Sequence, residues 1–134
     1  MADDALRAMV RQRADQRCEY YHIQQEQVPF VPFHVDHIIP RKHGGDTHPS
    51  NLASSCMHCN LHKSSDLSGI DPEGGTITPL FHPRRDRWAE HFAFEGALIV
   101  GLTLVGRATV RTLNMNGADR LEVREELLAR GASL

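Results

Sequence analysis

The chain has 134 residues, which is enough for one domain with a modest core. Its formal net charge is −2, so no bulk positive field marks it as a nucleic-acid-binding protein, and any contact with a polyanion must be local. Local basic clusters exist, and each taken alone is typical of a solvated helix face or loop. They are Arg7, Arg11, Arg13 and Arg17 near the start, and Arg84, Arg85 and Arg87 later.

The composition predicts a soluble protein of the cytoplasm. The start, residues 1–4, is acidic and lacks the basic and apolar regions of a secretory signal. The most apolar run, residues 97–102, is too short to span a bilayer. Three cysteines, an odd number, fit a disulfide framework poorly; they fit a reducing compartment better, where thiols bind metal or stay buried.

In chain order, the first predicted element is an amphipathic helix over residues ~4–16, where apolar side chains recur at helical spacing. A strand follows over residues 33–39 and is ended by a proline. Residues 42–51 are dense in turn formers and predict a loop. Residues 52–55 predict a short strand or turn, and residues ~58–65 predict a helix.

The second half predicts short strands and two helices. Residues 70–77 have the chemistry of a tight turn that joins two short extended pieces. Phenylalanines alternate over residues 92–94 and residues 98–102 form another apolar run, so a small antiparallel sheet is expected. Helices are expected over residues 103–113 and 118–130, the second ended by a glycine.

The residue types that carry chemistry gather in the middle of the first half. In order, they are His34-Val35-Asp36-His37-Ile38-Ile39-Pro40, Gly44-Gly45, Asn51-Leu52 and Cys56-Met57-His58-Cys59-Asn60-Leu61-His62-Lys63. This series supplies a candidate base, a metal carboxylate, a loop-fixing amide and a helix-borne ligand. Two cysteines at zinc-like spacing accompany them.

Together with Cys18-Glu19-Tyr20, this order resembles the HNH endonuclease family in an HNN-type variant, and the rest of the chain is similar to a group of small bacterial HNH proteins. The resemblance implies an α+β fold with a ββα-metal catalytic core over about residues 18–65. An N-terminal helix would precede this core. A C-terminal extension of short antiparallel strands and two helices, about residues 66–134, would follow, all within a single HNH nuclease domain spanning residues 1–134.

The resemblance also implies a role for each residue. Phosphodiester hydrolysis needs a deprotonated water and neutralisation of the charge that develops on the phosphate and the leaving oxygen. By position, His37 is the general base, and Asp36 and Asn60 are the metal ligands. Asn51 would hold the loop by hydrogen bonds to backbone. Lys63 is a candidate contact to substrate phosphate, with an ordinary solvated lysine as the alternative.

Asn60 stands where the family's name refers to a histidine. A carboxylate and an amide form an oxygen-only ligand pair, which favours Mg²⁺ or Mn²⁺ as the catalytic ion. His58 and His62 lie two residues from Asn60 on the predicted helix and so point about 200° away from it. His62 is kept as the alternative ligand.

The expected zinc site is incomplete. Cys56 and Cys59 form one Cys-x-x-Cys pair, whereas Cys18 has Tyr21 in place of its partner. A closed structural zinc site needs four ligands, and His22 could complete a Cys₃His set. In the alternative, the thiols and Tyr21 pack as core without zinc.

The sequence therefore predicts a metal-dependent endonuclease that hydrolyses phosphodiester bonds of DNA by a one-metal, histidine-general-base mechanism. RNA stays open as a substrate, and no membrane contact is expected. The alternative is a non-catalytic nucleic-acid-binding or scaffold module that retains the HNH fold. No module for reading base sequence is recognisable, so specificity could come from a homodimer, from a partner protein or from the structure of the substrate.

Overall fold

The computed structural model describes residues 4–134, and residues 1–3 of the acidic start lie outside this range. The predicted α+β class is confirmed: the described residues form five α-helices and three two-stranded antiparallel sheets. The fold divides into two compact units, one reaching to Asp66 with residues 82–85, the other formed by residues 67–81 and 86–134. The single domain expected over residues 1–134 stays a prediction.

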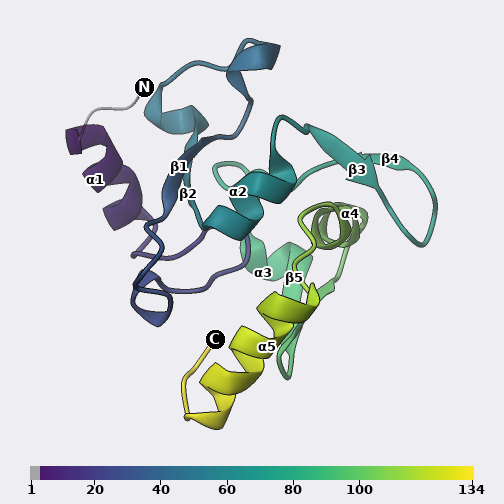
Figure 1. The fold of residues 1–134 in the computed structure, drawn as a ribbon. Helices are drawn as coiled ribbons and strands as arrows, with labels where there is room; N and C mark the ends of the chain where they lie inside the picture. Colours follow the sequence, from purple (N-terminus) through teal and green to yellow (C-terminus); the bar gives the residue numbers. More distant parts are fainter. Residues whose placement is uncertain (1–3) are drawn as a thin grey trace. The chain divides into compact units, whose positions relative to one another are not determined.

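Four elements build the first unit: α1 (Asp4–Arg13), β1 (His34–His37), β2 (Leu52–Ser55) and α2 (Met57–Lys63). The strands pair antiparallel, with His34 opposite Ser55 and His37 opposite Leu52. Figure 1 shows α1 and α2 on either side of this strand pair, and both helices contact it. Because every residue of β2 is buried, this strand forms the centre of the unit.

Helix α1 ends three residues earlier than the apolar spacing predicts. Asp15 and Gln16 adopt left-handed backbone, with φ of 55° and 57°, which breaks the helix. Two arginines of the basic cluster hold α1 to the strands by hydrogen bonds to backbone carbonyls. Arg13 donates to the Leu52 carbonyl at 2.7 Å, and Arg11 donates to the Phe33 carbonyl at 2.8 Å.

The loop predicted from turn formers connects β1 to β2 and contains two short 3-10 helices, Arg41–His43 and Pro49–Asn51. Gly44 ends the first of them with a φ of 87°, a backbone conformation that glycine adopts without strain. A Cβ at the next residue, Gly45, would overlap the Ile39 carbonyl oxygen. Two adjacent glycines therefore let the loop fold back tightly onto the end of β1.

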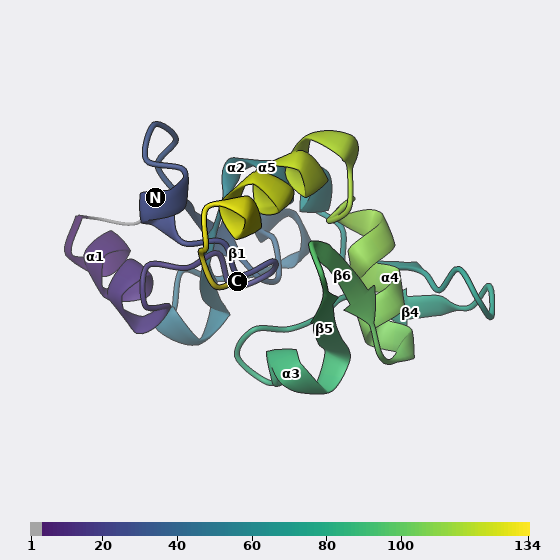
Figure 2. The same cartoon turned by 90° about the horizontal axis from the view of Figure 1, so that it is seen from below.

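The second unit contains two hairpins and three helices. Its elements are β3 (Ser68–Ile70), β4 (Ile77–Pro79), α3 (Trp88–His91), β5 (Phe92–Glu95), β6 (Leu98–Gly101), α4 (Leu104–Thr112) and α5 (Ala118–Ala129). The small antiparallel sheet expected from residues 92–94 and 98–102 is β5–β6, and the turn expected over residues 70–77 joins β3 to β4, which form a separate sheet. Figure 2 shows α4 between β6 and the β3–β4 hairpin, and α4 contacts all three strands.

Local capping accounts for the ends of the last two helices. The Thr103 hydroxyl accepts a hydrogen bond from the Gly106 N–H at 3.0 Å, which starts α4 where it was expected. Gly131, with a φ of 84°, follows α5. The one-turn helix α3 was not predicted, because four residues are too few to show a helical period. Across the described range, no helix is both long and apolar enough to cross a membrane.

A buried carboxylate fastens the β3–β4 turn to α4. Asp71 is fully buried and accepts hydrogen bonds from Arg107 Nε at 2.9 Å and Nη2 at 3.1 Å. Its carboxylate also accepts from the backbone N–H groups of Glu73 and Gly74, both at 3.2 Å. The hydrogen bonds from Arg107 are the main cause that lowers the pKa of Asp71 to about 2.

We expect this carboxylate to make the protein sensitive to acid. Since the pKa of Asp71 is lower in the folded state than the ordinary value of about 3.9, its stabilisation is complete above pH ~4 and is lost as the pH falls towards 2. Asp71→Asn should be less stable at neutral pH, and its free energy of unfolding should fall less between pH 4 and pH 2. Denaturant unfolding across this range measures both effects. If the free energy of unfolding fell equally steeply with pH in both proteins, the lowered pKa of Asp71 would be contradicted.

Candidate active site

Asp36 is the point where β1 and α2 are joined. The Tyr20 hydroxyl donates to Asp36 Oδ2 at 2.7 Å, and Lys63 Nζ lies 3.3 Å from the same oxygen. Lys63 also donates to the His37 carbonyl at 3.2 Å. The side chains of Lys63 and Asp36 are only 2% and 6% exposed. Lys63 is thus a buried cation that ties the end of α2 to β1, while its expected contact to substrate phosphate stays a prediction.

The two oxygens of Asp36 are used differently. Both of these contacts go to Oδ2, and no hydrogen bond from a described residue reaches Oδ1. Burial raises the pKa of Asp36, and the positive charge of Lys63 opposes this. Burial also raises the pKa of Tyr20, which keeps its hydroxyl protonated as a donor. Oδ1 is therefore the oxygen of Asp36 that could contact a cation.

His37 is the last residue of β1, in keeping with the expectation that the strand would twist or end at this point. Its side chain is partly exposed, and Nε2 lies 3.1 Å from Thr47 Oγ1 in the loop. The same hydroxyl oxygen accepts from Arg41 Nη2 at 3.4 Å. Burial, then the positive charge of Arg41, lowers the pKa of His37 below its ordinary value. The imidazole is therefore neutral at neutral pH and able to accept a proton.

Asn51 binds the loop to the end of β1. Its Oδ1 accepts from the Ile39 N–H at 2.8 Å, and its Nδ2 donates to the carbonyls of Ile39 at 3.0 Å and Asp46 at 2.8 Å. The side chain is buried, and these partners are distant in sequence, unlike those of an Asx turn. This arrangement fixes the backbone on both sides of the loop next to His37.

Asn60 lies in α2, three residues before Lys63. Residues three apart share a helix face, and Lys63 reaches Asp36, so Asn60 belongs to the face of α2 that meets β1. Its side-chain amide has no hydrogen-bond partner among the described residues, which leaves its oxygen available. His62, the alternative ligand, is exposed; its Nδ1 hydrogen-bonds to the His58 carbonyl at 2.8 Å on its own helix.

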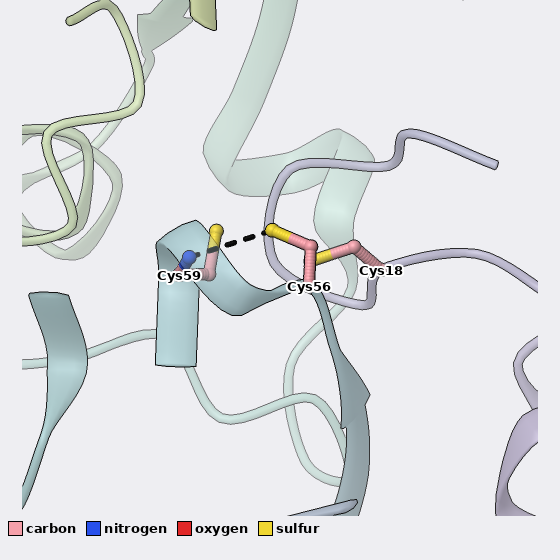
Figure 3. Close-up of side chains that lie close together, drawn as sticks. All are labelled: Cys18, Cys56 and Cys59. Atoms are coloured by element: carbon pink, nitrogen blue, oxygen red, sulfur yellow. Dashed lines mark hydrogen bonds between the residues drawn. The ribbon is translucent and has the colours of Figure 1, made fainter. Parts of the chain in front are cut away.

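Three thiols converge at the start of α2, as Figure 3 shows. The sulfur atoms of Cys18, Cys56 and Cys59 all lie within 4.8 Å of one another, and all three residues are buried and free of disulfides. Cys56 caps the helix, and its Sγ accepts from the Cys59 N–H at 3.4 Å. A closed group of soft sulfur ligands fits zinc.

The protonation of these thiols is uneven. Hydrogen bonds from Cys18 and Cys59 lower the pKa of Cys56 to about 4. Burial raises the pKa of Cys18 to about 12 and raises that of Cys59 as well. Tyr21, which stands in place of the fourth thiol, also hydrogen-bonds to Cys56 and so helps to lower its pKa. These opposing shifts make Cys56 the thiol of the three that ionises most readily, and a bound cation would favour ionisation of the other two.

His22 is not part of the converging group, which within the described residues contains only the three thiols. Its backbone is left-handed, with a φ of 70°, and its N–H donates to the Cys18 carbonyl at 2.9 Å. Burial, then the charge of Arg17, lowers the pKa of His22 to about 4, which keeps the imidazole neutral as a metal ligand must be. The role of His22 as fourth zinc ligand stays a prediction.

Sequence reasoning assigned no role to Tyr20, although Tyr20 belongs to the motif with Cys18, and it did not single out Thr47 or Arg41 as site residues. Tyr20 and Thr47 each contact a motif residue, Asp36 or His37, across 10 to 16 positions of sequence. No spacing rule connects such positions, so only their closeness to Cys18 and to the glycine pair could have drawn attention to them.

Residues 16–66 match a family model described as HNH endonuclease. The match covers less than half of the chain, lies inside the first unit, and includes every residue assigned to the site. For this segment, it agrees with the resemblance seen in the sequence. Comparisons with curated proteins and with solved structures find no match to the chain.

Lys63→Met should lower the free energy of unfolding by about 3–5 kcal/mol, because it leaves the buried Asp36 carboxylate without its cation. Lys42→Met is the matched control: Lys42 is exposed, and its loss should change stability by no more than about 0.5 kcal/mol. Urea denaturation measures both variants. If Lys63→Met cost as little as Lys42→Met, the buried ion pair would be wrong and a solvated or phosphate-binding lysine would be favoured.

The purified protein should retain about one zinc ion per chain after dialysis, because three buried sulfurs already converge. Cys59→Ser should lose most of that zinc, and His22→Asn should weaken zinc binding if the imidazole is the fourth ligand. Elemental analysis of the three proteins checks this. Zinc far below one ion per chain in the unmodified protein would show that the thiols are packed as core.

Proposed function

We propose, from the membership of residues 16–66 in the HNH endonuclease family, that the protein is a metal-dependent endonuclease that hydrolyses phosphodiester bonds of DNA. One observation carries the proposal. Tyr20 and Lys63 contact Asp36 at Oδ2, which leaves Oδ1 as the oxygen that could bind a cation, in the residue next to His37.

Asp36 and Asn60 would hold the catalytic ion. They come from two elements in contact, β1 and α2, and both offer oxygen, the ligand that Mg²⁺ and Mn²⁺ prefer. When bound, the ion supplies charge neutralisation at the phosphate and at the departing oxygen. Lys63 acts as a positioning residue, because its ammonium group fixes the orientation of the Asp36 carboxylate.

His37 is the proposed general base. When its Nε2–H donates to the Thr47 hydroxyl oxygen, Nδ1 carries the lone pair that takes a proton from water. The hydroxide attacks phosphorus, and the bond to the leaving oxygen breaks. Arg41 favours the neutral imidazole, and Asn51 keeps the loop that carries Thr47 folded against β1.

A second candidate is a module that binds nucleic acid or acts as a scaffold without cutting it. Tyr21 favours this candidate, because a zinc brace that has lost one thiol suggests relaxed constraints on the catalytic unit. For both the endonuclease and the non-catalytic module, we propose a location in the cytoplasm. In both cases RNA stays open as the nucleic acid, and a homodimer or a partner protein could supply specificity.

The discriminating experiment is cleavage of supercoiled plasmid with Mg²⁺ or Mn²⁺. His37→Ala should lower the rate about 10²–10⁴-fold by removing the base. Asn60→Ala should also lower it strongly, whereas His62→Ala should retain activity because His62 is bonded to its own helix. Each variant is first checked for native unfolding behaviour.

Equal nicking by the unmodified protein and His37→Ala would indicate contamination or a different base. Loss of activity in His62→Ala but not in Asn60→Ala would show that His62, and not Asn60, is the ligand of the catalytic ion. Much faster cleavage with nickel or zinc than with magnesium or manganese would count against an oxygen-only ligand pair.

A further inference from the structure

A cavity of about 460 Å³ opens directly beside His37 in the first unit. It is lined by Arg7, Arg11, Val31, Pro32, Phe33, His34, Val35, His37 and Met57. This volume falls in the range of roughly 300–1,000 Å³ that is usual for small-ligand sites. Its lining comes from α1, from the segment before β1, from β1 itself and from the start of α2.

The charged part of the lining is suited to an anion. Arg7 and Arg11 contribute guanidinium groups, His34 adds an exposed imidazole, and no acidic residue of the described range lines the cavity. Arg7 is only weakly engaged, since its partner Asp4 is fully exposed and 3.7 Å away. Arg11 is more strongly held, since its Nη2 donates to the Phe33 carbonyl at 2.8 Å and its Nε is buried. Arg7 is therefore the main donor offered to a phosphate, and Arg11 adds positive charge to the wall.

The rest of the lining is apolar. Val31, Pro32, Val35 and Met57 form walls that suit a flat, uncharged group. Next to them, Phe30 is 95% exposed, an unusual state for an aromatic side chain of this size. Basic groups combined with apolar or aromatic surface are the two features by which proteins bind single-stranded nucleic acid.

The cavity lies on the catalytic side of the unit. His37, the proposed base, is part of its wall, and Met57 is three residues before Asn60 on the same face of α2. A nucleotide that entered the cavity would therefore lie next to the phosphodiester being cut.

We propose that this cavity binds one unpaired nucleotide of the substrate strand, with its base against the apolar wall and its phosphate on Arg7, next to the positive charge of Arg11. Bases within a continuous duplex are stacked and cannot enter such a cavity without first being turned out, which costs free energy. The substrate is then DNA that is single-stranded, bulged or mismatched next to the cleavage point. This inference rests on the proposed function and specifies its substrate class.

The test is fluorescence anisotropy in EDTA, so that binding is measured without cleavage. Three labelled DNAs of one sequence are compared: a perfect duplex, the same duplex with a one-nucleotide bulge, and the same bulge with an abasic nucleotide. We expect the bulged duplex to bind about tenfold more tightly than the other two. Arg7→Gln should reduce the affinity for bulged DNA and lower the slope of log affinity against log salt by about one.

Arg130→Gln is the matched control. Arg130 is an exposed arginine that directly follows α5, and it forms an ion pair with Glu126 of that helix. This variant should leave binding unchanged. Equal affinities for the three DNAs would overturn the inference, and the comparison needs no variant that could misfold. Arg7→Gln behaving like Arg130→Gln would also overturn it.

The outcome separates the two proposals. If the protein prefers the bulged DNA but shows no cleavage that depends on His37, the nucleotide-binding site is supported and the endonuclease activity is contradicted. If cleavage depends on His37 but binding shows no preference for an unpaired base, the endonuclease activity is supported and the nucleotide-binding site is contradicted.

Discussion

A buried ion pair joins strand β1 to helix α2 where Lys63 meets Asp36, and the Tyr20 hydroxyl shares the same carboxylate oxygen. Burying two charges is costly unless they are paired and hydrogen-bonded, so this arrangement tolerates little displacement. It is tight because Lys63 also donates to the backbone of His37. One set of contacts therefore fixes the candidate metal carboxylate, the candidate base and the end of the helix that carries Asn60.

Helix α2 has only seven residues and would not be stable alone in water. Both ends of the helix are held. At its start, Cys56 and Cys59 belong to the cluster of three thiols, and at its end Lys63 pairs with Asp36. Asn60 lies between these two anchors. The loop across from it is fixed separately by the three hydrogen bonds of Asn51. The contacts at both ends of α2 and the hydrogen bonds of Asn51 together explain how a small unit can hold reactive side chains in place.

Local chemistry predicted much of this fold. The strand before Pro40, the cap at Thr103 and the glycine after α5 each follow from a few neighbouring residues. The family and the grouping of thiols could also be predicted, because motif order is visible in one dimension. The burial of Lys63 could not, since an isolated lysine on a helix normally faces water and its partner is 27 positions away.

The central claim is that Asp36 and Asn60 together hold one divalent ion. A crystal grown with Mn²⁺ and measured for anomalous scattering tests it most directly, because the position of the ion is seen rather than inferred from activity. We predict a manganese peak in contact with the free oxygen of Asp36 and the side-chain oxygen of Asn60, distinct from any zinc at the cysteines. A peak on His58 and His62, or no manganese near Asp36, would contradict the assignment.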